Sequence, residues 1–309
     1  MLFRALVCAS LLGGALSLSA VESPRPMRVL FFSKSANFEH SVVKRLNGQP
    51  SWAEQVLAEL GAKHGFAFTF TKDGSLITPA YLAQFDALFF YTCGFITSGV
   101  PNVDGQPPLT EAGLQAVYDA VAAGKGFVAC HSAADCFHTG EQPQVKFQHE
   151  PGRWVNHGAA SHPWVKFLGG EFIRHGPQQV TTLRAVSPAF PGLEKLPAEL
   201  RLHEEWYSLK DFAPDLHVVH VQETAGMEGA EYRRPPYPAT WARRHGAGRI
   251  FYTSLGHRED VWASEFFQTV ILAGLNWATG RTDADLAPNL AQVAPGHATM
   301  PVEPAPTAK

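Results

Sequence analysis

Residues 126–130 read GFVAC, and the polar segment 131–135 (HSAAD) follows at once. Five consecutive small and apolar residues indicate a strand that is buried on both faces of a sheet. Residues 110–123, just before this run, place Leu114, Val117 and Val121 at the spacing of a helix that faces a core. The two segments together predict a helix followed by a buried strand that ends at Cys130.

The same alternation occurs elsewhere in the chain. Residues 51–64 predict a helix with Trp52, Val56, Leu57 and Leu60 on one face, and residues 262–278 predict a closing helix. The other predicted strands are residues 27–32 (MRVLFF), 66–70, 87–91 (ALFFY), 200–209, 216–223, 239–243 and 249–254. Strands that alternate with helices and are almost continuously apolar are typical of a parallel sheet covered on both faces. We therefore predict an α/β protein with a mostly parallel sheet.

The ends of the chain differ in composition from its centre. Residues 1–20 contain Arg4, an apolar run at 5–18 and then small residues, which is the pattern of a signal peptide. The apolar run is shorter than the roughly 20 residues that span a bilayer comfortably, so we predict cleavage and export to the periplasm or the medium, an uncleaved anchor being the alternative. Residues 281–309 are rich in Pro, Ala and Thr and predict a disordered tail. One domain is expected over residues 27–280.

Charge and cysteine content restrict the partners and the compartment. The 25 Lys and Arg residues against 28 Asp and Glu give a net charge of −3 without a basic run, so neither nucleic acid nor an anionic membrane surface is expected as a partner. A small neutral ligand fits the charge better.

After loss of Cys8, the cysteines Cys93, Cys130 and Cys136 remain on or near predicted strands, which favours buried thiols. A Cys130–Cys136 disulfide is the alternative, because only a short loop separates the two residues.

Several histidines follow predicted strands. His40, His131 and His257 come after the strands at 27–32, 126–130 and 249–254. Ligands of open parallel sheets bind beyond the carboxyl ends of the strands, so we expect these three histidines to lie at one edge. His175 ends the segment 167–175, which lies in a long irregular stretch, 137–176, of the kind that often carries function. Glu205 belongs to HEEWY at 203–207, where only one of two adjacent carboxylates can face a common pocket.

Three or four imidazoles and one carboxylate suit two kinds of chemistry. One is coordination of a divalent metal such as zinc, with His40, His131, His175 and His257 as the candidate ligands. The other is general acid–base catalysis on a hydroxyl or carbonyl, with His131, His257 and Glu205 as the candidate catalytic residues. No histidine pair has the helical spacing of a zinc protease, so the sequence leaves both readings open.

A covalent nucleophile is a third reading of the segment around residue 130. Cys130 with His257 as its base would make an amidotransferase-like hydrolase. The register of the strand instead places His131 at the turn, and Ser132 is better explained as a helix cap. Aromatic residues that could stack on sugar rings cluster in or beside the same segments, although most of them are expected in the core; they are Trp154, Trp164, Trp206, Tyr207, Trp241 and Trp262.

Five segments in this order resemble the ThuA-like (trehalose utilisation) family over residues 27–280. They are FFSKSANFEH (31–40), GKGFVACHSAAD (124–135), SHPWVKFLGGEFIRH (161–175), HEEWY (203–207) and GAGRIFYTSLGHRED (246–260). The resemblance implies a class I glutamine amidotransferase-like fold, a flavodoxin-like three-layer α/β/α sandwich. In that fold His131 would stand at the position of the cysteine nucleophile and His257 at that of the catalytic histidine.

The resemblance also implies a role in carbohydrate metabolism, on trehalose, related disaccharides or 3-keto-sugars. The residues on family motif positions are His40, His131, His162, His175, Glu205 and His257. The chain departs from the family where the usual Asp-Glu before Tyr appears as Glu204-Glu205-Trp206-Tyr207. We expect His40, His162, His175, Trp206 and Tyr207 to contact a small carbohydrate.

Three functions follow from these observations. The first is an enzyme, an isomerase, lyase or hydrolase, that acts on a sugar or 3-keto-sugar by His/Glu acid–base chemistry with or without a divalent metal. The second is a sugar-binding module without catalysis. The third is the hydrolase that uses Cys130.

Overall fold

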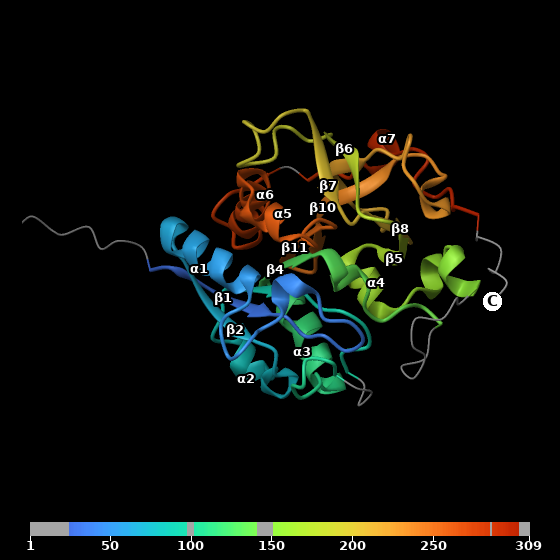
Figure 1. Cartoon of the computed structure of the whole chain (residues 1–309). Helices are drawn as coiled ribbons and strands as arrows, with labels where there is room; N and C mark the ends of the chain where they lie inside the picture. Colours follow the sequence, from blue (N-terminus) through green and yellow to red (C-terminus); the bar gives the residue numbers. More distant parts are fainter. Residues whose placement is uncertain (1–24, 98–101, 141–150, 285, 303–309) are drawn as a thin grey trace, which may run out of the picture.

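The computed structural model describes residues 25–97, 102–140, 151–284 and 286–302 (Figure 1). Its strands are β1 (Met27–Phe32), β2 (Phe66–Thr71), β3 (Ala87–Phe90), β4 (Gly126–Cys130), β5 (Glu171–His175), β6 (Gln179–Ala185), β7 (Glu199–Glu204), β8 (Tyr207–Lys210), β9 (His217–Gln222), β10 (Tyr237–His245) and β11 (Gly248–Thr253). Its α-helices are α1 (Trp52–His64), α2 (Pro79–Leu82), α3 (Glu111–Ala122), α4 (Pro163–Leu168), α5 (Glu259–Ala263), α6 (Glu265–Ala278) and α7 (Leu290–Val293). Short 3₁₀ helices are η1 (Ser41–Val43), η2 (Gly74–Leu76), η3 (His131–Ala134), η4 (Pro151–Trp154), η5 (Gly158–Ala160) and η6 (Ala230–Tyr232).

A nine-stranded sheet forms the centre of the mixed α/β fold, in the order β2-β1-β3-β4-β11-β10-β9-β6-β7. The strands from β2 to β11 are parallel, as the sequence predicts. From β11 to β7 the pairing is antiparallel. Only Gly246 and Ala247 lie between β10 and β11, and so short a connection permits only an antiparallel hairpin. The prediction of parallel strands therefore holds for one half of the sheet.

Helices cover both faces of the parallel half because successive strand residues point to opposite sides. On β1, Val29 and Phe31 belong to the apolar cluster that includes residues of α1 and α6. Leu30 and Phe32 belong to the cluster on the other face, which includes residues of α3 and α4. The nearly continuous apolar runs in the sequence thus arise from burial on both sides.

Two predicted elements divide at polar residues. The closing helix predicted at 262–278 is α5 and α6, because the Ser264 side chain accepts a hydrogen bond from the Phe267 N–H and starts a new helix. The strand predicted at 200–209 is β7 and β8, which belong to different sheets, β8 pairing with β5 in a two-stranded sheet. The chain turns at Glu205 and Trp206 between them.

The segment predicted to be irregular, residues 137–176, contains α4 and β5 in its described part. Residues 281–302, which composition predicts to be disordered, pack on the domain instead, with residue 285 outside the description. Leu290 and Ala294 join the core. The Asn289 side-chain amide accepts a hydrogen bond from the Val218 N–H of β9 and donates one to the Val218 carbonyl. A few apolar residues are therefore enough to order a Pro/Ala-rich segment when they pack into the core of the domain.

Several sequence predictions concern residues at the edge of the described structure. The signal peptide predicted at 1–20 and the last residues, 303–309, lie outside the described residues. Within the described part, no helix has the length and apolar content needed to cross a bilayer.

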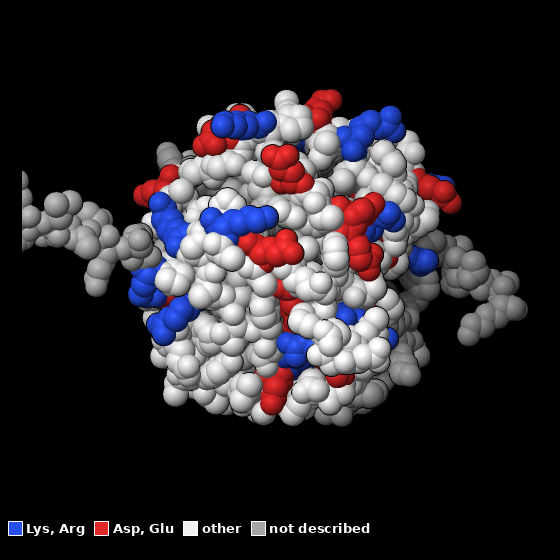
Figure 2. All heavy atoms as spheres, turned by 60° about the vertical axis from the view of Figure 1, so that its left-hand side comes forward, with Lys and Arg blue, Asp and Glu red and all other residues white. Residues whose placement is uncertain are grey.

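Cys93, Cys130 and Cys136 are free and buried, so the alternative Cys130–Cys136 disulfide is not formed. On the face shown in Figure 2, Lys and Arg are interspersed with Asp and Glu.

Candidate functional site

Three histidines from separate loops meet at the carboxyl edge of the parallel strands. His40 ends the loop after β1, His131 follows β4 directly, and His257 lies in the loop after β11. Their ring centroids are 4.8 Å (His40–His131), 5.2 Å (His40–His257) and 5.2 Å (His131–His257) apart. The parallel order β1-β3-β4-β11 places these loops side by side.

His131 occupies a sharp turn. Its φ of 45° lies in the left-handed region that favours glycine, whereas Cys130 before it is still extended, with φ −140°. The Tyr252 hydroxyl donates to the His131 carbonyl at 2.8 Å and holds the turn. His131 is therefore the residue that the strand-to-helix turn projects, and Cys130 remains in the strand.

Glu205 adds a carboxylate to the three histidines. Its Oε2 lies 3.0 Å from Nδ1 of His257 and 3.4 Å from Nε2 of His131, and its Oε1 lies 3.3 Å from Nδ1 of His175. Glu204 instead accepts hydrogen bonds from the backbone N–H groups of Gly256 and Glu205. Only one of the two adjacent carboxylates reaches the histidines, as predicted, although β7 ends at Glu204 and Glu205 lies in the turn after it.

The hydrogen bonds of His131 determine which nitrogen carries its proton. Nδ1 lies 3.0 Å from the Ser254 carbonyl, which can only accept, so Nδ1 holds the proton. The unprotonated Nε2 therefore faces Glu205 Oε2 and lies 3.3 Å from Nδ1 of His257. The electron pairs of a neutral imidazole and a carboxylate converge here, and this arrangement is stabilised either by a cation between them or by a proton on His257 Nδ1.

Burial and the carboxylate set the charges of the cluster. Burial lowers the pKa of His131 and lowers that of His40 further, so both imidazoles are neutral at pH 7. Burial also lowers the pKa of His257, but the hydrogen bond to Glu205 and its negative charge outweigh burial and raise it overall. Burial raises the pKa of Glu205, yet the contacts with the imidazoles of His131, His257 and His175 outweigh burial and hold it well below its usual range.

These four residues fit a divalent metal. One ligand atom from each of His40, His131, Glu205 and His257 lies within 4.8 Å of the others. Bonds of 2.0–2.2 Å to a tetrahedral zinc would place ligand atoms about 3.3–3.6 Å apart, close to the 3.0, 3.3 and 3.4 Å found for Glu205–His257, His131–His257 and His131–Glu205. The buried Nδ1 of His40 has no hydrogen-bond partner in the described structure. Glu205 thus takes the place in this set that the sequence assigns to His175.

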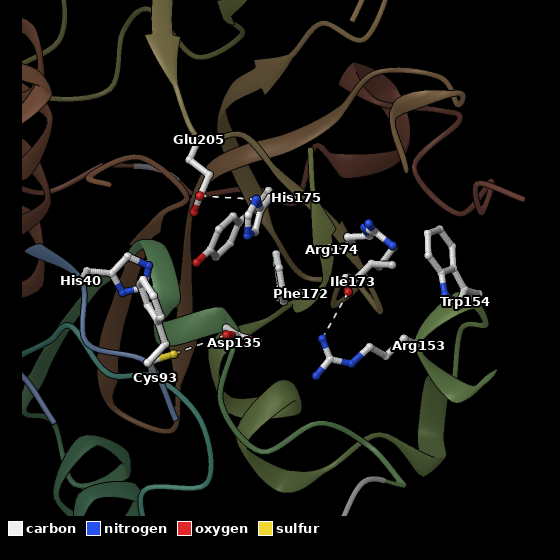
Figure 3. A pocket seen from close by; sticks show the side chains of 12 residues that line it. His40, Cys93, Asp135, Arg153, Trp154, Phe172, Ile173, Arg174, His175 and Glu205 are labelled. Atoms are coloured by element: carbon white, nitrogen blue, oxygen red, sulfur yellow. Dashed lines mark hydrogen bonds and ion pairs between the residues drawn. The ribbon is translucent and has the colours of Figure 1, made fainter. Parts of the chain in front are cut away.

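A cavity of about 450 Å³ opens beside the cluster (Figure 3). Its size is that of a small-molecule site. Its walls carry apolar and aromatic side chains together with polar groups from β5 and the loops at the sheet edge. The lining residues are Phe38, His40, Cys93, Asp135, Arg153, Trp154, Phe172, Ile173, Arg174, His175, Glu205 and Tyr207.

The structure places the residues expected to contact a carbohydrate in two groups. His40, His175 and Tyr207 line the cavity. His162 lies elsewhere, where its Nδ1 accepts from the Trp164 N–H and caps α4. Trp206 is buried, and its indole N–H donates to the Gln179 carbonyl. The roles of all five residues remain predictions.

Sequence reasoning did not single out several cavity residues. Asp135 closes the segment HSAAD after β4, so its position at the sheet edge was an available signal. Phe172 and Cys93 carry no comparable signal, because a buried phenylalanine and a buried cysteine look like core residues in a sequence. Their approach to the cavity depends on the β5–β8 pairing and on the loop after β3.

The geometry also bears on Cys130. Its thiol is fully buried at the end of β4 and does not line the cavity. Burial raises the pKa of Cys130 well above its usual value, and the thiolate is the nucleophilic form of cysteine. Both observations argue against the amidotransferase-like hydrolase.

The sequence profile of the ThuA (trehalose utilisation) family matches residues 28–150 and 148–278. The chain belongs to the ThuA family. A ThuA-like protein from Bacteroides uniformis has a similar fold, with 18% identity, 87% of this chain and 98% of that chain covered, and a TM-score of 0.58. A ThuA-like protein from Parabacteroides merdae matches at 16% identity over 90% of this chain and 98% of that one, with a TM-score of 0.55. No curated protein matches the chain.

Proposed function

We propose that this ThuA-family protein binds a sugar or a 3-keto-sugar in the cavity and processes it by proton transfer beside a divalent metal. The observation that carries the proposal is the set formed by the buried His40, His131 and Glu205 with the partly buried His257, whose ligand atoms lie within 4.8 Å of one another. A bound divalent ion such as zinc would polarise a sugar oxygen and acidify a C–H group next to a ketone. The family's link to trehalose utilisation supports a carbohydrate substrate.

His175 is suited to the proton transfer when the other histidines hold a metal. Its Nδ1 faces two acceptors, the Gly176 carbonyl at 2.9 Å and Glu205 Oε1 at 3.3 Å, so Nδ1 carries the proton. Nε2 is then free to accept a proton. The side chain is 46% exposed and lines the cavity, which gives a ligand access to it.

Without a metal, the same cluster supports the acid–base assignment to His131, His257 and Glu205. Glu205 would orient His257, whose pKa it raises, and His131 would accept through its unprotonated Nε2. If the core is the flavodoxin-like three-layer sandwich of the class I glutamine amidotransferases, His131 stands where those enzymes carry their nucleophile. The two mechanisms differ in whether the purified protein contains a metal.

Elemental analysis of the tag-free mature protein tests the proposal, beside His131→Ala and a control, His64→Ala, on the exposed end of α1. We expect about one divalent metal per chain in the wild type and in the control, and little in His131→Ala. The same samples are then incubated with 3-keto-trehalose and with trehalose, and turnover is followed by NMR. Turnover that survives in His131→Ala would refute the assignment of this cluster.

The aromatic lining supports a second function, sugar binding without catalysis. Phe172 and Tyr207 lie 4.2 Å apart between ring centroids and line the cavity with Trp154. Aromatic faces bind the C–H surfaces of sugar rings. For this function, Phe172→Ala would abolish binding of trehalose, whereas His175→Ala would leave it unchanged and no product would form in the wild type.

The compartment is part of the proposal. The signal-peptide pattern at residues 1–20 supports export to the periplasm or the medium, where the partner would be a small carbohydrate. Mass spectrometry of the N-terminus of secreted protein would test this. A chain that begins at Met1 would contradict cleavage.

A further inference from the structure

Asp135 is a buried carboxylate in the wall of the cavity. It follows η3, lines the cavity and is only 6% exposed (Figure 3). Its Oδ1 lies 2.6 Å from Nε2 of His138, and among the described residues its Oδ2 accepts a single side-chain hydrogen bond, from the Cys93 thiol at 3.4 Å. Oδ2 therefore keeps accepting capacity toward the cavity.

His138 fixes the charge of Asp135. Its two ring nitrogens both face carboxylates, Nε2 toward Asp135 and Nδ1 toward Glu171 Oε1 at 3.3 Å. Both nitrogens must carry protons to bond two acceptors, so His138 is an imidazolium. Although burial raises the pKa of Asp135, the hydrogen bond and charge of His138 outweigh it and lower that pKa overall. Asp135 is thus ionised despite its burial.

The charges continue away from the cavity. Glu171 also accepts from the Thr139 hydroxyl at 2.9 Å and lies 3.5 Å from the ammonium of Lys210. That ammonium is 3.2 Å from Nδ1 of His157 and 3.8 Å from Asp211. His157, Glu171 and Asp211 are close enough to hold a metal, but Lys210 already supplies their cation. This end of the network is structural.

Buried charges are costly unless each has a partner, and apolar side chains in their place often stabilise a fold equally well. Stability alone therefore does not explain this buried network of charges. The one carboxylate of the network that lines the cavity is Asp135. A carboxylate only accepts hydrogen bonds, so it favours hydroxyl donors and repels phosphates and carboxylates. Arg153, in the same cavity, donates to the Ile173 carbonyl and lies with its guanidinium carbon 6.0 Å from the centre of the Phe172 ring.

We propose that Asp135 determines specificity by accepting hydrogen bonds from hydroxyls of a neutral sugar that lies against Tyr207 and Phe172. The inference rests on the proposed function and names its substrate class: an uncharged, polyhydroxylated ligand rather than a sugar phosphate or a sugar acid. His138 and Glu171 hold Asp135 ionised and in place.

Calorimetric titration of the zinc-loaded protein with trehalose, its monodeoxy analogues and trehalose 6-phosphate tests this proposal. The variants are Asp135→Asn and a matched control, Asp211→Asn, which makes the same change at the far end of the network. A hydrogen bond to a charged group predicts about 10- to 100-fold weaker trehalose binding in Asp135→Asn, with little change in the control. The wild type should discriminate against one deoxy analogue, and Asp135→Asn should lose that discrimination.

Zinc content separates the role of Asp135 from the proposed function. Asp135→Asn should retain its metal, because it is not among the four cluster residues. Equal trehalose affinity in Asp135→Asn and wild type, equal losses in both variants, or tighter binding of trehalose 6-phosphate than of trehalose would each overturn the role of Asp135. A zinc-loaded wild type without affinity for any of these sugars would overturn the proposed function as well.

Discussion

His131 turns its unprotonated Nε2 toward Glu205, and the two acceptor atoms, Nε2 and Oε2, lie 3.4 Å apart. The Ser254 carbonyl enforces this arrangement by accepting a hydrogen bond from the protonated Nδ1. The backbone just after β11 thus orients the imidazole as a ligand without a bound ion. Such outer hydrogen bonds fix the orientation of histidine ligands in metal sites and raise their basicity.

Glu205→Gln should weaken metal binding strongly. The amide keeps the size of the side chain but removes the negative charge that balances a divalent ion. We expect at least about a 100-fold loss of zinc affinity, on the scale of an unbalanced buried charge. Competition with a chromophoric chelator measures it. Glu204→Gln is the control, since Glu204 bonds backbone N–H groups instead of the histidines; equal zinc affinity in wild type and Glu205→Gln would remove Glu205 from the set.

Tyr252→Phe should loosen the turn at His131. The Tyr252 hydroxyl is fully buried and donates to the His131 carbonyl, so its loss leaves that carbonyl without this donor and costs about 1 kcal/mol of unfolding free energy. Zinc affinity should fall several-fold as well. Tyr118→Phe is a matched control, because the buried Tyr118 hydroxyl has no partner in the described structure. Urea denaturation of the two variants should show a loss for Tyr252→Phe and no loss for Tyr118→Phe.

The His138 network should make stability depend on pH. Burial lowers the pKa of His138, but hydrogen bonds from its ring to Asp135 and Glu171 outweigh burial and raise it to about 9. Because the pKa of His138 is raised in the folded state, protonated His138 stabilises the fold fully at pH values below its unfolded pKa of about 6.5. This contribution is lost as the pH rises through about 9. The shift corresponds to on the order of 3 kcal/mol.

Urea denaturation of metal-free protein between pH 6.5 and 9.5 measures this contribution. The wild type should lose unfolding free energy over that range, and His138→Gln should be less stable at pH 6.5 and lose much less on going to pH 9.5. Parallel pH profiles for the two proteins would show that His138 is not the titrating group.

Thiol alkylation should be slow in the folded protein. Cys93, Cys130 and Cys136 are buried and free, and burial raises the pKa of each thiol. Iodoacetamide at pH 7.5 should label the native protein far more slowly than the urea-unfolded protein, as mass spectrometry would show. Rapid labelling of Cys130 with loss of activity would instead favour the amidotransferase-like hydrolase.

Local sequence predicted the parallel half of the fold well. Residues 27–32 and 126–130 are strands with the predicted bounds, and the helices at 51–64 and 110–123 differ from α1 and α3 by a residue at one or both ends. These elements are decided by their own apolar pattern and by caps such as Ser51 and Thr110. The antiparallel half was harder, because β5 and β6 are mixed in polarity and β5 pairs with β8, which is not the next strand along the chain.

By itself, the sequence determined which loops carry His40, His131 and His257. The apolar runs identify the strands, and the polar loop that follows each parallel strand lies at the carboxyl edge of the sheet. Only the tertiary structure decided that Glu205 joins them, that His162 and Trp206 lie elsewhere, and that Asp135 faces the cavity. The physical reason is that side-chain direction after a strand depends on where the chain turns and on what it packs against. The break after Glu204 and the left-handed turn at His131 arise from contacts far apart in the sequence, such as those of Gly256 and Tyr252.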